Sequence, residues 1–536
     1  MSNSLSEFDE PSEFVAAEGS ESALPLGKQQ SLGKAAGHGF SWFSISIIVG
    51  KVLNFLTQLV LGAILLDEEF GIFAIASSIA VFLRVFNDGG VAHVLVQRGK
   101  SQFDRLAGPA FWISMCFSLA TGLLMAAITP LAVHLYGNSQ LAPLMYLLAV
   151  TIPLSCPATI LKAKLRVELR FQTIAWISVS WFLIRQSGTI ILALLGYGAM
   201  SFVIPLPFVT LLELVAVSVI TRITPWKGKI RVSQWPEILG SSFWVAFAAF
   251  LRGLSSNGDY IVLGLLVPTA ILGQYFFGYQ LTVQFAVLMA ANIQYVLFPV
   301  MSHLASEPAR QARAIVRTIR LMTLVAAPFS LIVAATISSI EALAWQEKWA
   351  AAVPLMQIFS VAAPLRLISE IVHAAIMSRG QFRRSAKLRL FEALLLMFSA
   401  WLAVRLFGAN LTQIALLIAA SQATFSVVLT LVVLRGYGIR PADVWRAFLP
   451  AWTTATAVAA LTVAVSGWYL NALPQLVRLL LETCLFSGGF LLLARMLFSK
   501  QLEELASVVP GSLKGLVRRV FLLKQIAAGS KPIRRT

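Results

Sequence analysis

Four basic side chains interrupt otherwise apolar stretches of this chain. They are Lys51, Arg84, Arg185 and Arg252, and each lies well inside its stretch. If the stretches are membrane-spanning helices, a rise of about 1.5 Å per residue places all four cations near the middle of a bilayer. An ionisable group at that depth costs about 2.5–3.5 kcal/mol on insertion scales, so it usually faces a cavity or a partner. The sequence therefore predicts a cationic site that suits an anionic cargo.

Acidic residues nearby leave structural interpretations open for the same cations. Arg84 and Asp88 are one helical turn apart and could neutralise each other. Arg252 could pair less directly with Asp259, and Arg185 has only Glu213 as an interhelical candidate. Asp88 and Asp259 are also the best candidates for coupling to protons or sodium.

Polar residues accompany the cations. Asn54 lies about one turn beyond Lys51 and gives the first stretch a polar stripe, which could bind cargo or another helix. Polar breaks at 86–90 and 254–260 predict irregular backbone beside a cavity. His and Cys are scattered, so we predict no metal site, no cofactor and no catalytic residue.

The composition identifies the elements that must hold these residues. The chain has 536 residues, of which 58% are hydrophobic and only 12% charged, whereas soluble domains are about 25% charged. This excludes a soluble enzyme and predicts an all-α polytopic membrane protein with fourteen spanning helices. The expected spans are 41–65, 71–96, 109–133, 141–161, 173–195, 200–220, 238–266, 269–299, 317–340, 351–377, 390–408, 411–434, 447–470 and 476–497.

The net charge of +18 is explained by topology. Nearly all loop cations follow even-numbered spans, whereas the odd-numbered loops hold only Lys348, Arg405 and Arg478. Because cytoplasmic loops are enriched in Lys and Arg, both termini are predicted to be cytoplasmic. Nucleic-acid binding is therefore not expected. We predict an acidic disordered tail over 1–38 and a basic tail over 499–536, where residues 512–526 suit an interfacial helix or an unstructured segment.

Two similar segments recur at nearly one spacing. VLGAILLDEEFGIFA from Val60 resembles VLGLLVPTAILGQYF from Val262, and PLMYLLAVTIP from Pro143 resembles PLMQIFSVAAP from Pro354. Six spans separate each pair, so the halves keep the same sidedness. The sequence predicts two parallel six-helix bundles, 39–235 and 236–435, followed by two extra helices within 436–498.

This organisation resembles the polysaccharide transporter, or O-antigen flippase, family of the MOP exporter superfamily, which includes the MATE exporters. The segment 61–98 resembles the first hairpin of bacterial lipopolysaccharide and exopolysaccharide exporters, with Phe70-Gly71 and Asp88-Gly89-Gly90 retained. The family's usual proline in the turn is replaced by Asp67 or Glu68.

The resemblance implies a flippase of the bacterial inner membrane. It would move an undecaprenyl-diphosphate-linked oligosaccharide from the cytoplasmic to the periplasmic leaflet during exopolysaccharide or lipopolysaccharide biosynthesis, by alternating access. Membrane lipids and polysaccharide polymerase or export machinery would be its partners. Lys51, Arg84, Arg252, Asn54 and Arg185 would then bind substrate, with the cations holding the diphosphate. A MATE-type multidrug or cation antiporter is the alternative, and a membrane-bound polysaccharide-synthesis enzyme is less favoured because the external loops are short.

Overall fold

The computed structural model describes residues 46–508, except 48, 85–86, 88–89, 229–234, 284–300, 303 and 305–306. Within these residues every regular element is helical, as the sequence predicts. Asp88, the acidic tail over 1–38 and the segment 512–526 lie outside the described residues, so the predictions on them stay predictions.

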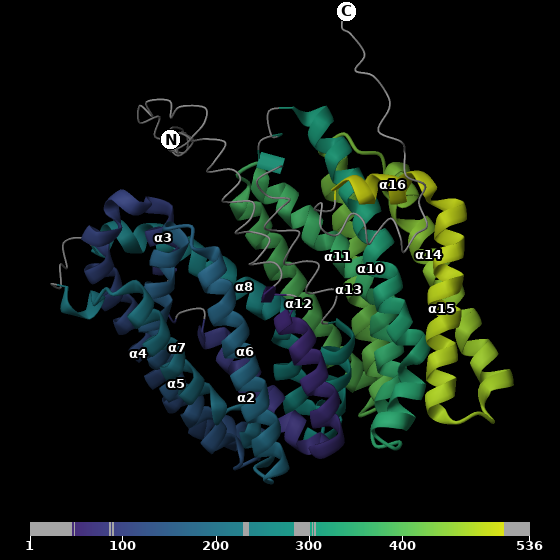
Figure 1. Cartoon of the computed structure of the whole chain (residues 1–536), viewed down its shortest axis with the longest axis horizontal. Helices are drawn as coiled ribbons and strands as arrows, with labels where there is room; N and C mark the ends of the chain where they lie inside the picture. Colours follow the sequence, from purple (N-terminus) through teal and green to yellow (C-terminus); the bar gives the residue numbers. More distant parts are fainter. Residues whose placement is uncertain are drawn as a thin grey trace, which may run out of the picture.

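Long helices succeed one another through short turns (Figure 1). Among the described residues, the first long helix spans Val49–Ile64, and residues 269–283 form another. The other long helices are α2 (Asp67–Arg84), α4 (Lys100–Tyr136), α5 (Leu141–Val167), α6 (Phe171–Leu194), α7 (Pro205–Thr221), α8 (Trp235–Leu266), α10 (Pro308–Ala344), α11 (Val353–Ser378), α12 (Phe382–Phe407), α13 (Leu411–Arg435), α14 (Pro441–Val465) and α15 (Gln475–Leu497). Shorter elements are α3 (Val91–Arg98), η1 (Gly198–Phe202), η2 (Pro225–Lys227), η4 (Ala350–Ala352), η5 (Ser466–Leu470) and α16 (Ser499–Val508).

Ten helical segments among the described residues are long and apolar enough to cross a membrane. The expected spans outside this set include those that carry Lys51, Arg84 and Arg252. The helix that carries Lys51, Val49–Ile64, is apolar but shorter than the others, and α2 holds four charged residues. The chain is thus a multi-pass helical membrane protein, and the count of fourteen stays a prediction.

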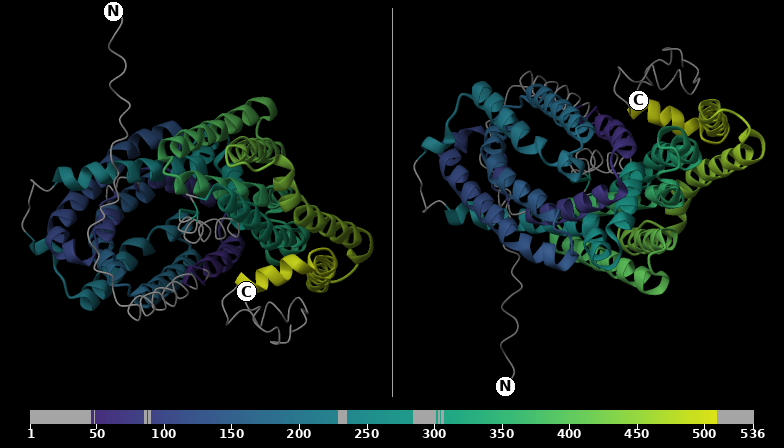
Figure 2. Two further views of the ribbon diagram at one scale, coloured as in Figure 1. Left: turned by 90° about the horizontal axis from the view of Figure 1, so that it is seen from above. Right: turned by 90° about the horizontal axis from the view of Figure 1, so that it is seen from below.

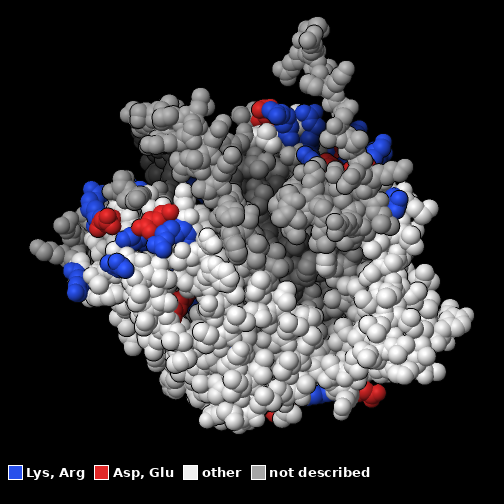
Figure 3. Space-filling view, in the orientation of Figure 1, with Lys and Arg blue, Asp and Glu red and all other residues white. Residues whose placement is uncertain are grey.

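The helices of the two halves of the chain form neighbouring groups (Figure 2). Seen from above, the helices of the first half form one group, and those of the second half lie beside it. Helices α14 and α15 pack against α10 at the outer side of the second group. Lys and Arg side chains gather at one end of the helices, and the middle of the molecule is largely uncharged in this view (Figure 3).

The two halves contact each other reciprocally through close backbone approaches. A Cβ atom added to Gly71 would collide with the carbonyl oxygen of Thr269, and one added to Gly273 would collide with that of Asp67. Gly273 follows Gly71 by 202 positions, and Thr269 follows Asp67 by the same number, so the two contacts are equivalent with the halves exchanged. Glycine is required here because any side chain would separate the halves.

A second set of contacts crosses between the halves near the same helix ends. Trp345 donates its indole N–H to the carbonyl of Leu59 at 2.9 Å, and the Tyr136 hydroxyl reaches the carbonyl of Ile261 at 3.4 Å. Leu59 and Ile261 are again 202 positions apart. The contacts are therefore reciprocal here too, as in an interface around a two-fold axis.

Lys348, in the second half, caps the C-terminal end of the helix Val49–Ile64 in the first half. Its ammonium group contacts the carbonyl oxygens of Gly62 at 3.2 Å and Leu65 at 2.5 Å. A cation at a helix C-terminus satisfies carbonyls that have no partner within the helix. Trp349 adds a hydrogen bond of 2.8 Å to the Gly62 carbonyl and packs on Phe70. This end of the inter-half boundary is therefore closed.

The two predicted polar breaks differ in outcome. The first is confirmed, because α2 ends at Arg84 and α3 begins at Val91 after Gly90, whose φ is 79°. The second is wrong, because α8 continues through 254–260. Within it the Ser255 hydroxyl donates to the Arg252 carbonyl, and the Asn257 amide donates to the Gly253 carbonyl. The helix persists since its polar side chains bond to its own backbone.

Candidate cargo-binding site

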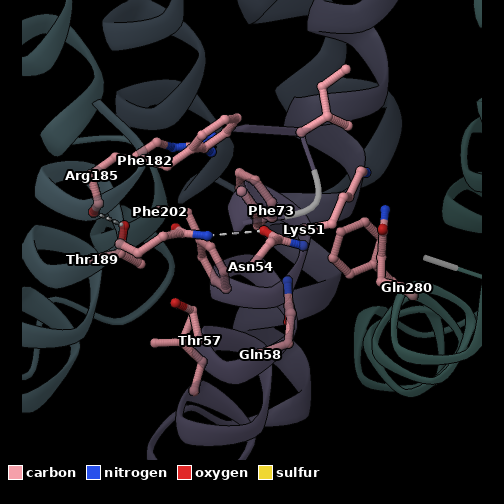
Figure 4. A pocket seen from close by; sticks show the side chains of 15 residues that line it. Lys51, Asn54, Thr57, Gln58, Phe73, Phe182, Arg185, Thr189, Phe202 and Gln280 are labelled. Carbon is pink, nitrogen blue, oxygen red and sulfur yellow. Dashed lines mark hydrogen bonds between the residues drawn. The ribbon is translucent and has the colours of Figure 1, made fainter. Parts of the chain in front are cut away.

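A cavity of about 320 Å³ lies between the first helix, α6 and the helical residues 269–283 (Figure 4). Lys51, Asn54 and Arg185, which the sequence predicts as substrate-binding residues, all line it. The volume is at the lower end of the range for sites that hold small molecules. The structure thus brings together three of the five predicted substrate-binding residues.

Helical periodicity aligns the polar residues of the first helix. Lys51, Asn54 and Gln58 lie at spacings of three and four residues, which places them on one face. Helix α6 presents Arg185 and Thr189 from the opposite side (Figure 4), and Gln186 of the same helix also lines the cavity. The Gln186 amide donates a hydrogen bond of 3.1 Å to the Asn54 side-chain oxygen, so the two helices are joined at the cavity wall.

One hydrogen-bond donor of Arg185 has no partner among the described residues. Its Nε atom is buried and has no hydrogen-bond partner among the described residues, and its guanidinium lies 5.3 Å from the Trp181 ring centroid. The predicted alternative partner, Glu213, instead forms an ion pair of 2.9 Å with Lys162, so that pairing is wrong. A buried cationic donor without a partner is costly, and a bound anion would satisfy it.

The charged side chains that line the cavity, among the described residues, are all positive. Its lining among the described residues includes Lys51 and Arg185 but no Asp or Glu. The charge of Arg84 also acts on Arg185, so a third cation lies nearby. Like charges in a low-dielectric setting repel one another. An anion bound between them would relieve this repulsion.

The other two predicted cations do not line this cavity. Arg84 stands in the last turn of α2, ahead of the break in the helix. Arg252 is exposed on α8, and its charge acts on His373 in the second half. The structure therefore groups Arg185 with Lys51 and places Arg252 with the second half.

Asp259, predicted to couple an ion, belongs to a buried polar network in the second half. It accepts a hydrogen bond of 2.8 Å from the Tyr275 hydroxyl, while its Oδ1 atom has no hydrogen-bond partner among the described residues. Arg366, whose charge acts on Asp259, donates to Tyr279. Arg389 continues the network through ion pairs of 2.6 Å with Glu370 and 3.0 Å with Glu392.

Aromatic side chains form the part of the cavity wall that the sequence did not single out. Phe73 and Phe202 stack with centroids 4.2 Å apart, and Phe276 meets Phe73 edge-on at 5.8 Å. Gln186 and Gln280 also line the cavity. Isolated glutamines within apolar stretches are a signal that could have identified both, whereas phenylalanines are common throughout such helices.

Comparison with known proteins identifies relatives that are named for polysaccharide biosynthesis or transport. Residues 60–354 match the family model described as polysaccharide biosynthesis protein. The chain is 20% identical to the lipopolysaccharide biosynthesis protein WzxC of Escherichia coli over 365 residues, covering 67% of this chain and 73% of WzxC. It is 24% identical to the succinoglycan biosynthesis transport protein ExoT of Rhizobium meliloti over 315 residues, covering 58% and 62% of the two chains.

Solved structures share the fold. The lipid II flippase MurJ in an inward closed conformation aligns with a TM-score of 0.66 at 15% identity, covering 85% of this chain and 99% of MurJ. An inward-facing multidrug resistance MATE transporter of the MOP superfamily aligns with a TM-score of 0.57 at 15% identity, covering 74% and 98%.

Proposed function

Because the chain belongs to the polysaccharide biosynthesis protein family, we propose that it moves a lipid-linked oligosaccharide across the bacterial inner membrane. The cargo would be an undecaprenyl-diphosphate-linked oligosaccharide, passed from the cytoplasmic to the periplasmic leaflet for exopolysaccharide or lipopolysaccharide biosynthesis. The observation that carries the proposal is the buried Nε of Arg185, which has no hydrogen-bond partner among the described residues and belongs to a cavity whose described lining has two cations and no acid. Arginine suits a diphosphate because its planar fork matches two phosphate oxygens.

Alternating access of two six-helix bundles is the mechanism we propose. The reciprocal contacts of Gly71 with Thr269 and of Gly273 with Asp67 support a parallel repeat related by an axis along the membrane normal. The fourteen-helix organisation, with bundles over 39–235 and 236–435 and two helices within 436–498, is part of the same proposal. Rocking of the bundles would open the end that Lys348 and Trp349 close.

Both termini are proposed to be cytoplasmic. The concentration of basic loops after even-numbered spans supports this topology. In a cysteine-free background, a single cysteine at position 383 should react with a membrane-impermeant maleimide only after the cells are permeabilised. Labelling in intact spheroplasts would contradict the topology.

A multidrug or cation antiporter is the second candidate, since a MATE transporter shares the fold. A cationic cargo would meet Lys51 and Arg185 in the cavity, and the repulsion disfavours it. A polysaccharide-synthesis enzyme is disfavoured by the same site, whose described lining offers no carboxylate, histidine or cysteine to act as acid, base or nucleophile.

Ion coupling is proposed at Asp259, and Asp88 stays a candidate from the sequence. The Oδ1 atom of buried Asp259 has no hydrogen-bond partner among the described residues, which supports a role for this carboxylate in proton or sodium exchange. Polymerase or export machinery would receive the cargo on the periplasmic side. Lys51, Asn54 and Arg185 would hold the cargo in the cavity, and Arg84 and Arg252 would guide its diphosphate from outside the described lining.

Reconstituted protein should flip its cargo in vesicles. Liposomes would be loaded with a fluorescent undecaprenyl-diphosphate oligosaccharide, and transport measured as loss of protection from an added glycosidase. Protein-containing vesicles should expose the inner-leaflet glycan faster than empty ones. The same assay under imposed proton or sodium gradients tests Asp259, because Asp259→Asn should remove the gradient dependence. Equal rates with and without protein would refute the proposed function.

A further inference from the structure

The part of the cavity around Gln58 has a chemistry that differs from the part around Lys51. Along the first helix, Gln58 lies about 10 Å beyond Lys51, from seven residues at about 1.5 Å each. Asn54 lies between them in Figure 4, and its side chain accepts a hydrogen bond from Gln186. The cavity thus changes from charged to amide-lined along its length.

The amide groups supply both donors and acceptors. Gln58 is 8% exposed, and its Oε1 atom is buried with no hydrogen-bond partner among the described residues. The Asn54–Gln186 bond uses one acceptor of Asn54 and one donor of Gln186, which leaves the Asn54 amide donor and the Gln186 oxygen for a ligand. Neutral groups that both donate and accept match hydroxyls, which do the same.

The wall beside these amides is aromatic. Phe73 and Phe202 stack on each other, and both line the cavity with Phe276. A sugar ring has hydroxyls around its rim and an apolar face of C–H groups. Amides beside an aromatic surface can therefore bind both aspects of one sugar, in the way that small-molecule sites combine an apolar lining with a few placed polar groups.

We propose that Asn54, Gln58 and Gln186, with the Phe73–Phe202 wall, form a subsite that selects the sugar unit attached to the diphosphate. This inference rests on the proposed function, since Lys51 and Arg185 must hold the diphosphate for the sugar to extend toward Gln58. The cavity of about 320 Å³ holds a molecule of small-ligand size, so discrimination is concentrated on this unit and the distal glycan lies beyond it.

Binding by the purified full-length protein in nanodiscs tests the subsite. The probes are inorganic pyrophosphate, farnesyl diphosphate, and farnesyl diphosphate linked to glucose, galactose or N-acetylglucosamine. At least one sugar-linked probe should bind about tenfold more tightly than farnesyl diphosphate, and the sugars should differ among themselves by roughly 3–10-fold for each hydrogen bond gained or lost.

A double variant isolates the amide pair. Asn54→Leu with Gln186→Met removes both partners of the bond and keeps similar volumes, so neither amide is left unpaired. This variant should bind the sugar-linked probes no more tightly than farnesyl diphosphate and should not distinguish one sugar from another. Its affinity for farnesyl diphosphate itself should be unchanged. Gln58→Met should give a partial loss. Gln413→Leu, at an exposed position on α13 away from the cavity, is the matched control and should bind like the parent.

The outcomes separate the two proposals. If diphosphate probes bind but no sugar adds affinity, or the double variant still distinguishes sugars, the subsite is refuted and the proposed function stands. If none of the probes binds, including pyrophosphate, the proposed function itself fails.

Discussion

Replacing Arg185 with alanine is expected to lower the affinity for pyrophosphate and for the lipid-linked cargo by about 10- to 100-fold. A hydrogen bond to a charged group contributes about 1.5–3 kcal/mol, and each 1.4 kcal/mol is tenfold in affinity. The Nε of Arg185 is buried without a hydrogen-bond partner among the described residues, so folding should not suffer from its loss. Arg185→Lys should recover part of the affinity, because it restores charge without the fork.

The measurement is pyrophosphate binding together with the vesicle flipping assay. Arg495→Ala is the matched control, since Arg495 is exposed near the end of α15 and does not line the cavity. Insertion and thermal unfolding of both variants should equal those of the parent. Flipping by Arg185→Ala at the parental rate would mean that this cation does not hold the cargo.

Gly273→Ala is expected to open the end of the molecule where the two halves meet. The added methyl group would collide with the backbone carbonyl of Asp67, which cannot rotate away as a side chain could. Overpacking of this kind costs about 1–3 kcal/mol. The cost falls only on the state in which these ends touch, so the conformational equilibrium should shift roughly 5- to 100-fold toward separation. Gly71→Ala should act likewise through Thr269.

Spin labels at positions 139 and 346 report this separation, because these exposed residues lie in turns of the first and second halves. The three native cysteines must first be replaced. Gly273→Ala should lengthen the measured distance and slow flipping. Gly488→Ala is the control, since a methyl group there meets open space. An unchanged distance distribution in the glycine variants would show that the close approach does not set the equilibrium.

The sequence predicted features that depend on local chemistry. Depth-counting within apolar stretches found Lys51 and Arg185, because a charge in such a stretch stands out against its neighbours. The break before α3 was predictable, since Gly90 adopts a positive φ that other residues rarely take. The break in α8 was predicted wrongly, because Ser255 and Asn257 can bond within their own helix as readily as they can interrupt it.

Features that depend on which helices are neighbours could not be predicted from the sequence. Glu213 faces Lys162 on α5 rather than Arg185 on α6, and nothing in the spacing of these residues distinguishes the two options. The aromatic wall of the cavity was missed for a related reason. Phe73 and Phe202 are ordinary apolar residues until helix packing brings them together beside the amides.

The excess of positive charge in the cavity has a consequence for the energetics of the transport cycle. Under the proposed function, a dianionic diphosphate would balance Lys51 and Arg185, and the loaded carrier would move little net charge. The empty carrier would keep both positive charges, and a charge crossing the full field gains about 2.3 kcal/mol per 100 mV. An inside-negative membrane potential would therefore draw the empty site back toward the cytoplasm, so that voltage assists the return step and not the step that carries the glycan.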